Sequence, residues 1–338
     1  MSESLTVAVC GTGAWGTAMA IYLAKAGCDT RLIARRAELA TQLNEYRENK
    51  DYLAGYLLPE NLVATDSIVE GLAGAEIVFM GAPSYALRGW MERIEAEVDD
   101  GVKRLYISLA KGLDQETGQT PCEIMKEARP HDFVACLSGP TFAAEVAEGK
   151  PTAMTLAAEE CGDLAERIQC AASGPGMRIY LSDDLKGVEL GGCLKNVYAI
   201  ASGCCQGLEL GDNALAALLT RSLTEMVRVG QSLGAKVETF YGLSGFGDMV
   251  ATCHGDWSRN RTFGEEIAKS DRTAAEIVAS QKTAVEGYRT AKAFFNECAA
   301  KGIDAPILRQ VYRILYEGKR PIEALTTLMS RDLKKEWG

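Results

Sequence analysis

Histidine is almost missing from this chain. Among its 338 residues only two are histidine, His131 in the polar turn ARPHDF and His254 beside Gly255 and Asp256. Histidine is the usual proton carrier near neutral pH, and neither position suits that task. If the protein moves protons, another side chain must carry them.

Other absences exclude whole classes of protein. The 36 basic side chains are outnumbered by 46 acidic ones, and the net charge of -10 argues against binding to nucleic acid or to acidic membrane surfaces. No apolar run approaches the ~18 residues of a membrane span. The start MSESLTVAVCGTG enters a predicted strand too early for a signal peptide. We therefore expect a cytoplasmic protein without a membrane span.

Cysteine is present, but its spacing indicates neither a disulfide framework nor a metal site. None of the 11 cysteines forms a C-x-x-C pair, and most lie in apolar stretches, as Cys10, Cys136 and Cys193 do. Thiols in such places act as small core side chains in a reducing compartment. We expect neither disulfides nor a bound metal ion.

What is present is a chain of two unlike parts. With 47% hydrophobic residues, it can bury the cores of two domains. Up to about residue 180, short β-rich runs alternate with helical patterns, which predicts βαβ units and a mostly parallel sheet. The predicted strands are residues 6–10, 30–34, 61–65, 76–80, 104–108, 133–137, 153–157 and 177–181.

After residue 185 the strand signal ends and helical periodicity dominates. The predicted helices are residues 188–203, 214–234, 265–270, 274–281, 289–302 and 308–318. A polar cluster at SDDLKG marks the boundary, without a long linker. The sequence thus predicts an α/β domain over residues 1–184 and an all-α domain over residues 185–338.

The first predicted strand runs directly into GTGAWG, and a helical pattern follows at once. In this context Gly11 permits a tight turn, Gly13 lets a pyrophosphate approach the backbone, and Gly16 allows close packing of helix on strand. Ala14 and Trp15 begin the helix, whose N–H groups and positive dipole attract an anion. We interpret the first domain as a Rossmann-type dinucleotide-binding domain, the alternative being a purely structural glycine turn.

The end of the second predicted strand bears on the choice of cofactor. Where an acidic residue would bind the ribose of NAD, this chain has Arg35 and Arg36. A guanidinium there can pair with the 2′-phosphate of NADP or stack on adenine. Arg35 is favoured because it follows the strand immediately, whereas an exposed loop position is an equal alternative for Arg36. The cofactor is NAD or NADP, with NADPH expected to be well accepted.

Ligands of such sheets bind at the carboxyl ends of the strands. At three of these ends the chain places the motifs GAPS, LAKG and SGPT. We expect Lys111 of LAKG to face the ligand cleft rather than bulk solvent. In SGPT, Gly139 offers a close backbone and Thr141 offers a hydroxyl.

The segment of residues 242–264, GLSGFGDMVATCHGDWSRNRTFG, is rich in glycine and polar side chains. We interpret it as a polar loop between helices that includes Asp248. Ser258, Arg259 and Asn260 together are donors suited to a phosphate at a helix start. An ordinary helix cap with a solvated arginine is the alternative.

Lys195 is a charge within a predicted helix of small and apolar residues. Gly191 and Gly192 share its face, and each glycine costs about 1 kcal/mol inside a helix unless something must approach the backbone. That partner is either a ligand or a neighbouring helix, and in the second case the lysine stem would reach out to water. With histidine so scarce, Lys195 is the leading candidate for the proton carrier, since burial lowers the pKa of a lysine.

Together these motifs resemble those of the bacterial-type NAD(P)-dependent glycerol-3-phosphate dehydrogenases. The resemblance spans residues 5–330 and rests on GTGAWGTA, GAPS, LAKGL, SGPTFAAEVA, LGGCLKNVYAIASG, GDNALAALLTRSLTEM, GLSGFGDMVATC, SRNRTFG and VEGYRTA, in the family's order and spacing. It implies a Rossmann domain joined to a helical substrate-binding domain. It also implies the reversible, NAD(P)H-dependent reduction of dihydroxyacetone phosphate to sn-glycerol 3-phosphate, which supplies phospholipid synthesis.

The resemblance extends to single residues and implies that Lys195 is the proton donor or acceptor at the substrate oxygen. The substrate ligands expected in this way are Lys111, Gly139, Thr141, Lys195, Asp248, Ser258, Arg259 and Asn260. With the positions argued above, the expected cofactor contacts are Gly11, Gly13, Ala14, Trp15, Gly16, Arg35, Arg36, Lys111, Ala143, Arg259, Ala284 and Glu286.

Two other classes of protein remain alternatives. A hydroxyacid or sugar-nucleotide dehydrogenase of similar build would act on other substrates, and a non-catalytic dinucleotide sensor would not need Lys195. Cys193 replaces a residue that is commonly small in the family, and its oxidation would disturb the neighbouring Lys195. The sequence does not fix the oligomeric state, and a homodimer is compatible with it.

Overall fold

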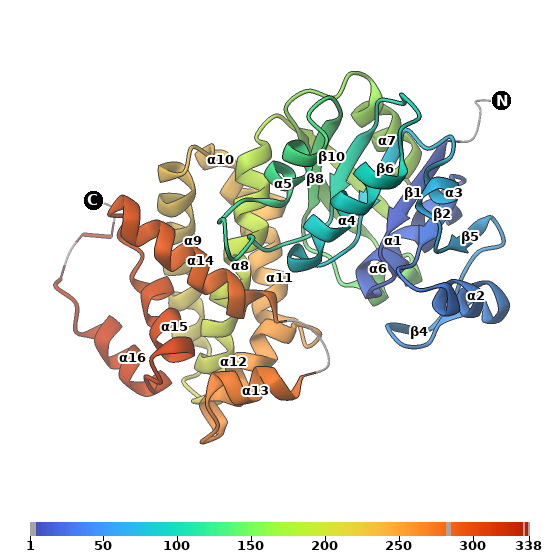
Figure 1. Cartoon of the computed structure of the whole chain (residues 1–338). Coiled ribbons are helices and arrows are strands. Elements are labelled where there is room, and N and C mark those ends of the chain that lie inside the picture. Colours follow the sequence, from blue (N-terminus) through green and yellow to red (C-terminus); the bar gives the residue numbers. More distant parts are fainter. Residues whose placement is uncertain (1–4, 282–284, 334, 337–338) are drawn as a thin grey trace.

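The chain forms two parts that lie side by side, an α/β part from the first half of the sequence and a helical part from the second (Figure 1). The structure is a computed structural model and describes residues 5–281, 285–333 and 335–336. Within these residues no helix combines the length and the apolar character needed to cross a membrane.

An eight-stranded sheet forms the centre of the α/β part, in the order β10-β9-β8-β7-β6-β1-β2-β5. Its strands are β1 Thr6–Cys10, β2 Asp29–Ile33, β5 Leu62–Thr65, β6 Ile77–Met80, β7 Leu105–Ser108, β8 Phe133–Ser138, β9 Thr152–Ala158 and β10 Met177–Ser182. All neighbouring strands are parallel except β8 and β9. Each predicted run is therefore a strand, and the mostly parallel sheet is confirmed.

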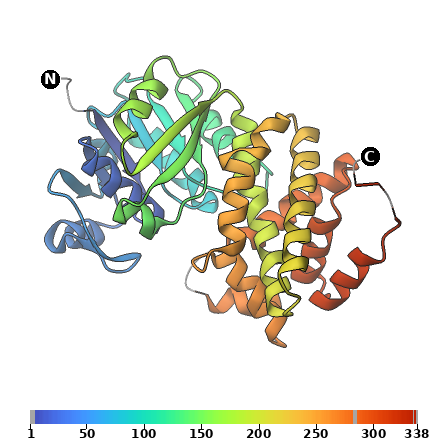
Figure 2. The ribbon, with the colours of Figure 1, turned by 180° about the vertical axis from the view of Figure 1, so that it is seen from behind.

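The alternation of side chains along β1 explains why helices cover both faces of this sheet. Val7 and Val9 join a buried cluster with α1, α2, α6 and α7, whereas Ala8 and Cys10 join a second cluster with α3, α4 and α5. These helices are α1 Ala14–Lys25, α2 Ala37–Tyr46, α3 Ile68–Leu72, α4 Ser84–Glu97, α5 Pro121–Ala128, α6 Ala143–Glu148 and α7 Leu164–Ala172. Figure 2 shows the sheet from the opposite side.

The order of the strands also fixes where a ligand can bind. β1 lies between β2 and β6, so the chain winds outward in opposite directions from β1. The carboxyl ends of β1 and β6 flank this switch point, where open α/β sheets have their ligand crevice.

A small hairpin between α2 and β5 was not predicted. It consists of β3 (Glu48–Asn49) and β4 (Leu53–Leu57), which pair antiparallel. The hairpin lacks a pattern of alternating apolar residues, because in β4 only Leu53 is buried and Leu57 is 69% exposed. Hydrophobic periodicity therefore gave no signal for it.

The second half of the chain is helical throughout its regular elements, as predicted. It comprises α8 Leu185–Gly207, α9 Asp212–Ser232, α10 Val237–Tyr241, the π-helical turn η1 Leu243–Gly247, α11 Asp248–His254, α12 Arg259–Lys269, α13 Ala274–Ser280, α14 Glu286–Lys301, α15 Pro306–Tyr316 and α16 Pro321–Met329. The long α8 runs through the middle of this part (Figure 1).

The prediction of a polar loop over residues 242–264 was wrong. Most of this segment is helical, forming η1, α11 and the first half of α12. Three of its glycines, Gly245, Gly255 and Gly264, serve close packing instead of a flexible chain. A Cβ atom on Gly245 would lie 2.3 Å from the carbonyl oxygen of Phe240, so only glycine fits there.

The packing of α8 against α12 shows the same use of glycine. A Cβ atom on Gly203 would lie 1.9 Å from the carbonyl oxygen of Arg261. From the other helix, a Cβ atom on Gly264 would lie 2.1 Å from the carbonyl oxygen of Ile200. The two helices therefore touch through their backbones, which holds α8 and its Lys195 firmly.

Candidate active site

The turn between β1 and α1 has the geometry that a dinucleotide-binding loop requires. Gly11 has a φ of +109°, a conformation that other residues rarely adopt. A Cβ atom on Gly16 would lie 2.2 Å from the carbonyl oxygen of Gly11, so the turn packs directly on the helix. By contrast, a Cβ atom on Gly13 would meet no atom within 4 Å. The first and third glycines are needed by the protein itself, and the second leaves open space.

This open space lies at the N-terminus of α1 and fits the pyrophosphate of a dinucleotide. Gly13 is the N-cap residue and supplies no side chain to the first N–H groups of the helix. Those donors and the helix dipole attract an anion. Trp15 follows Ala14 in the first turn of α1, and its buried indole Nε1 has no hydrogen-bond partner among the described atoms. A bound cofactor could supply the missing acceptor. The residues present therefore fit the cofactor.

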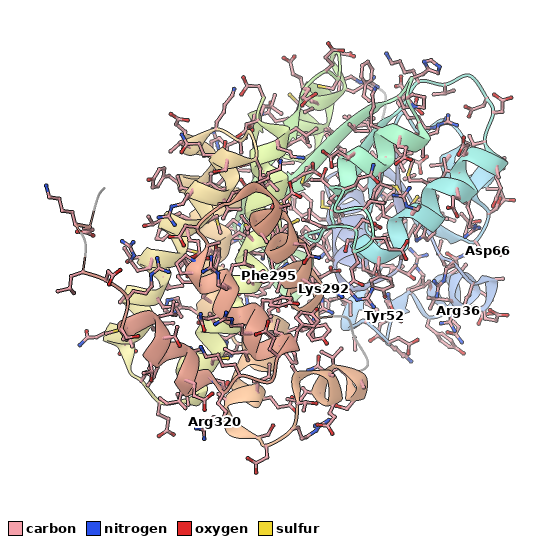
Figure 3. The ribbon with its side chains drawn as sticks, turned by 60° about the vertical axis from the view of Figure 1, so that its left-hand side comes forward. Arg36, Tyr52, Asp66, Lys292, Phe295 and Arg320 are labelled. Atoms are coloured by element: carbon pink, nitrogen blue, oxygen red, sulfur yellow. The ribbon has the colours of Figure 1, made fainter. Side chains whose placement is uncertain are left out.

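The remaining predicted cofactor residues lie on several elements. Arg35 and Arg36 follow β2, and both side chains are exposed. Figure 3 shows Arg36 on the same surface of the α/β part as the exposed Tyr52 of the hairpin. Ala143 is the first residue of α6. The predicted contact at Ala284 lies outside the described residues.

Glu286 connects the helical part to the carboxyl end of β6. It is the first residue of α14, and its carboxylate accepts a hydrogen bond of 3.0 Å from the hydroxyl of Ser84 in the GAPS motif. Both side chains pack onto Gly112, where a Cβ atom would lie 2.4 Å from the Glu286 carboxylate. The GAPS motif is apparent in the sequence, but the contact of Ser84 is not, because its partner is distant in sequence.

The two predicted lysines meet at one carboxylate. Lys195 Nζ donates to Asp248 Oδ1 at 2.6 Å and to the hydroxyl of Thr252 at 2.7 Å. Lys111 Nζ donates to Asp248 Oδ2 at 2.6 Å and to the carbonyl oxygen of Gly139 at 3.0 Å. The site thus joins β7, β8, α8 and α11 and spans both parts of the chain.

The surroundings of Lys195 show what approaches Gly191 and Gly192 and whether the lysine reaches water. A Cβ atom on Gly191 would lie 2.8 Å from the carbonyl oxygen of Ser244, and one on Gly192 would lie 2.9 Å from the hydroxyl of Ser138. The glycines therefore admit neighbouring protein elements. The lysine, however, is only 6% exposed, so its stem does not carry the charge out to water.

The electrostatics of the cluster suit a proton carrier. Burial lowers the pKa of Lys195 to about 8, outweighing the opposing effect of Asp248, and the charge of Lys111 lowers it further. Two cations share one carboxylate, which leaves the site attractive to an anion or to a developing negative oxygen. Burial also raises the pKa of the fully buried Cys193 well above its usual value, so this thiol stays protonated and shielded from oxidants.

A chain of carboxamides ties the site together behind the lysines. Asn196 donates to the backbone oxygen of Lys111 at 2.8 Å and accepts from Asn260 at 2.9 Å. The Asn260 oxygen accepts from the N–H of Gly287 at 2.9 Å. Asn196 was missed by sequence analysis, although it adjoins Lys195 in the LKN motif. Its place in the LKN motif was a signal, but the function of an asparagine within a helix becomes clear only from its hydrogen-bond partners.

The segment from Ser258 to Asn260 begins α12 beside this chain. Ser258 is buried and caps the helix by accepting from Arg261 N, so its side chain is the ordinary cap that was one of the alternatives. Arg259 is exposed in the first turn of α12. Thr141 donates to the carbonyl oxygen of Gly139 at 3.1 Å. Of the two arginines at the start of α12, Arg259 is exposed and available to a ligand, whereas Arg261 is held by hydrogen bonds and an ion pair within the protein.

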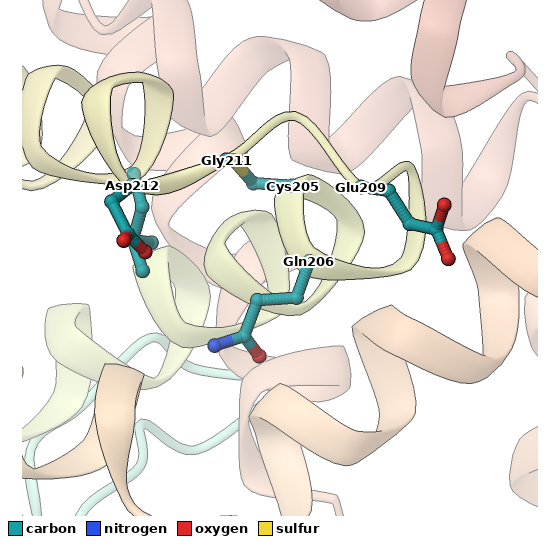
Figure 4. A pocket seen from close by; sticks show the side chains of 6 residues that line it. Cys205, Gln206, Glu209, Gly211 and Asp212 are labelled. Carbon is teal, nitrogen blue, oxygen red and sulfur yellow. The ribbon is translucent and has the colours of Figure 1, made fainter.

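A separate hollow of about 330 Å³ lies at the turn from α8 to α9 (Figure 4). Its lining residues are Cys205, Gln206, Glu209, Gly211, Asp212 and Leu215. It contains none of the predicted site residues and lies on the order of 15 Å along α8 from Lys195. The candidate site is therefore the cluster between the two parts of the chain.

The fold and this cluster define a dehydrogenase of the two-domain class, with a dinucleotide-binding α/β part and a helical part that brings a lysine to the strand ends. The NAD-dependent glycerol-3-phosphate dehydrogenase family matches the chain with its N-terminal pattern over residues 6–162 and its C-terminal pattern over residues 184–326. The chain belongs to this family. The expected enzyme class and the use of NAD or NADP are thereby confirmed.

Individual relatives agree over nearly the whole length. The chain is 45% identical over 335 residues to a glycerol-3-phosphate dehydrogenase [NAD(P)+] of Thermus thermophilus, covering 98% of this chain and 100% of that protein. It is 39% identical over 344 residues to one of Streptomyces griseus, covering 99% of each. A crystal structure of glycerol-3-phosphate dehydrogenase from Coxiella burnetii is 34% identical and superposes with a TM-score of 0.90, covering 97% of this chain and 99% of that one.

Proposed function

We propose that Lys195 is the proton donor and acceptor of this dehydrogenase in the interconversion of dihydroxyacetone phosphate and sn-glycerol 3-phosphate. The buried meeting of Lys195 and Lys111 on Asp248 carries the proposal. A lysine whose pKa is about 8 can both release and take up a proton near neutral pH. The scarcity of histidine and the family membership support the same assignment.

In the direction of reduction, protonated Lys195 gives its proton to the substrate oxygen as that oxygen gains negative charge. Asp248 and Thr252 hold Nζ in place through its other hydrogens. The charge of Lys111 stabilises the negative oxygen until the proton arrives. In the direction of oxidation, neutral Lys195 takes the proton of the alcohol. The nicotinamide cofactor supplies or accepts the hydride.

The chain's own residues would hold that cofactor at the switch point of the sheet. The open space at Gly13 and the N-terminal N–H groups of α1 would receive the pyrophosphate. Arg35 would meet the ribose end, and Glu286 with Lys111 would border the nicotinamide end. This placement supports the use of both NADH and NADPH, since the pyrophosphate site is common to the two.

The phosphate of the substrate would bind at the start of α12. Arg259 supplies an exposed charge there, and the first N–H groups of the helix add donors. Asn260 has both carboxamide ends engaged within the protein, so its side chain keeps α12 in register with Asn196. Gly139 and Thr141 would contact the substrate from the end of β8.

The finer predictions about the molecule are proposals as well. We propose a division into a dinucleotide-binding domain of residues 1–184 and a helical substrate domain of residues 185–338, which the end of β10 at Ser182 and the start of α8 at Leu185 support. A cytoplasmic location, a homodimer, the absence of nucleic-acid partners and a supply of glycerol phosphate to phospholipid synthesis remain predictions from the sequence and the resemblance.

The decisive experiment measures the oxidation of NADH and NADPH by the purified protein with dihydroxyacetone phosphate. Unphosphorylated dihydroxyacetone and a 2-keto acid serve as the comparison substrates. Of the three substrates, we expect only dihydroxyacetone phosphate to be turned over, and we expect this with either NADH or NADPH. Turnover of the keto acid in its place would identify a hydroxyacid dehydrogenase, and binding of cofactor without any turnover would identify a sensor.

A further inference from the structure

The hairpin that sequence analysis missed brings one buried side chain to the dinucleotide loop. Asn49 of β3 is 1% exposed. Its Nδ2 donates to the carbonyl oxygen of Thr12 at 2.8 Å and to the hydroxyl of Thr17 at 2.8 Å. Thr12 stands between Gly11 and Gly13, and Thr17 belongs to the first turn of α1. One carboxamide therefore holds both the loop and the helix that follows it.

The bond to Thr12 has a consequence for the loop because the peptide group is planar. In a trans peptide the C=O of one residue and the N–H of the next point in opposite directions. When Asn49 draws the Thr12 oxygen towards itself, the N–H of Gly13 is turned to the other side. Gly13 carries no side chain of its own, and a Cβ atom added to it would meet no atom within 4 Å, so there is open space at this residue.

Asn49 is placed for this contact by an irregularity in its strand. The pairing of β3 with β4 shifts between Glu48 and Asn49, as in a β-bulge, which redirects a side chain. One hydrogen of Nδ2 is donated to the loop at Thr12 and the other to α1 at Thr17, while Oδ1 is buried without any partner among the described atoms. An unpaired buried oxygen is costly, and such exceptions to hydrogen-bond pairing call for an explanation outside stability.

We propose that Asn49 is a positioning residue for the cofactor, which orients the Thr12–Gly13 peptide so that the loop is ready for the pyrophosphate before the cofactor arrives. The inference rests on the proposed placement of the cofactor at the Gly13 turn. Without Asn49 the peptide samples other orientations. The apparent affinity for the cofactor then falls by the fraction of time that the loop spends in the binding conformation.

The test is the dissociation constant of NADH and of NADPH for the Asn49→Ala and Asn49→Asp variants, measured by titration of nicotinamide fluorescence. We expect Asn49→Ala to weaken both cofactors by about tenfold, equally, because the pyrophosphate is common to them. Asn49→Asp should have a larger effect, since its carboxylate cannot donate and faces the Thr12 carbonyl oxygen. The KM for dihydroxyacetone phosphate and kcat at saturating cofactor should stay within about twofold of the parent.

Asn61→Ala is the matched control. Asn61 also donates from Nδ2 to two backbone carbonyl oxygens, at 2.8 Å to Ala24 and 3.1 Å to Cys28, but at the opposite end of α1. It should lower the midpoint of urea unfolding without changing the affinity for either cofactor. If Asn49→Ala fails to fold, Thr17→Val removes one of the two acceptors, keeps the hairpin, and should weaken both cofactors to a smaller extent.

Gly13→Ala separates this inference from the proposed function. Its added methyl group fits the free protein but occupies the space assigned to the pyrophosphate, so it should weaken both cofactors. If Gly13→Ala weakens binding and Asn49→Ala does not, the role of Asn49 is overturned while the cofactor site stands. If neither variant weakens binding, the cofactor does not lie on this turn and the proposed placement itself is wrong.

A loss of cofactor affinity in Asn61→Ala equal to that in Asn49→Ala would reduce the role of Asn49 to general stability.

Discussion

The turn between β1 and α1 is built from backbone groups, whereas the cluster around Lys195 is built from charged side chains. The first is made from glycines that are forced by close contacts at Gly11 and Gly16 and left open at Gly13. The second is made from Lys195 and Asp248, which are buried among helices and paired with each other. In the proposed function, one region selects its ligand by space and N–H groups, and the other acts through the protonation of one amine.

This difference predicts how the two regions respond to substitution. A change in the turn should alter cofactor affinity and leave chemistry intact once the cofactor is bound. A change in the cluster should do the reverse, because a group that acts only in the transition state lowers kcat without lowering affinity. Single substitutions in each region test this separation.

Replacing Lys195 should have the largest effect. Lys195→Met keeps the apolar stem but removes the proton carrier, so turnover should fall roughly a hundred- to ten-thousandfold, the usual contribution of a general acid. Asp248 keeps its ion pair with Lys111 at 2.6 Å, so the site does not lose its charge balance altogether. Steady-state kinetics and cofactor titration are the measurements.

Lys186→Met is the control for that variant. Lys186 lies on the same helix and pairs with Glu123 at 2.6 Å, but it is partly exposed and outside the site. Its replacement should leave turnover unchanged. Near-normal turnover in Lys195→Met would show that Lys195 is structural, and a large loss of cofactor affinity would show that the two regions are not separable.

The next effect concerns the phosphate of the substrate. Arg259→Ala should raise the KM for dihydroxyacetone phosphate by about ten- to 150-fold, as expected for the loss of a charge-assisted contact. Inorganic phosphate should compete with substrate in the parent enzyme and much less in the variant. The measurement is the inhibition pattern at fixed cofactor concentration.

Arg320→Ala serves as the control, since this exposed arginine is the N-cap residue of α16 and pairs with Glu323 at 2.8 Å, away from the site. It should change neither KM nor inhibition by phosphate. Equal activity of the parent on unphosphorylated dihydroxyacetone would contradict the assignment of Arg259.

The two regions also differ in how far the sequence could predict them. The turn is local, because GTGAWG and the strand and helix around it lie within one stretch of chain. The roles expected of Gly11 in the turn and of Gly16 in packing agree with the contacts found, while the pyrophosphate contact at Gly13 stays a prediction. The eight strands were equally accessible, since buried parallel strands are short apolar runs. The turn and the strands could be predicted because each depends on the pattern of residues within one short stretch of chain.

The cluster depends on contacts between distant segments, and there the sequence predicted residues without their partners. Lys111 and Asp248 were named as substrate residues, but their ion pair joins β7 to α11. Asn196, Ser84 and Asn49 were missed because each acts through a partner far along the chain. The glycines of residues 242–264 were misread as a loop, since composition cannot distinguish a flexible glycine from one that admits a neighbouring backbone.

A smaller effect concerns the choice between the two cofactors. Arg35→Asp should raise the KM for NADPH about tenfold more than that for NADH, because it removes a partner of the 2′-phosphate and adds a repulsion. The measurement is the ratio of kcat/KM for the two cofactors. Equal effects on both would assign Arg35 to general structure, and strict use of NADH by the parent would show that this arginine points away from the ribose.

The smallest expected effect is a shift in the pH dependence, and it reports on the protonation of Lys195 directly. Reduction needs the protonated amine, so kcat/KM for reduction should fall as the pH rises through about 8, while kcat/KM for oxidation should rise over the same range. Thr252 accepts a hydrogen bond from Nζ and so favours the charged form. Thr252→Val should therefore move both midpoints to lower pH by less than about one unit. A midpoint that moves upward, or two limbs that do not mirror each other, would mean that another group carries the proton.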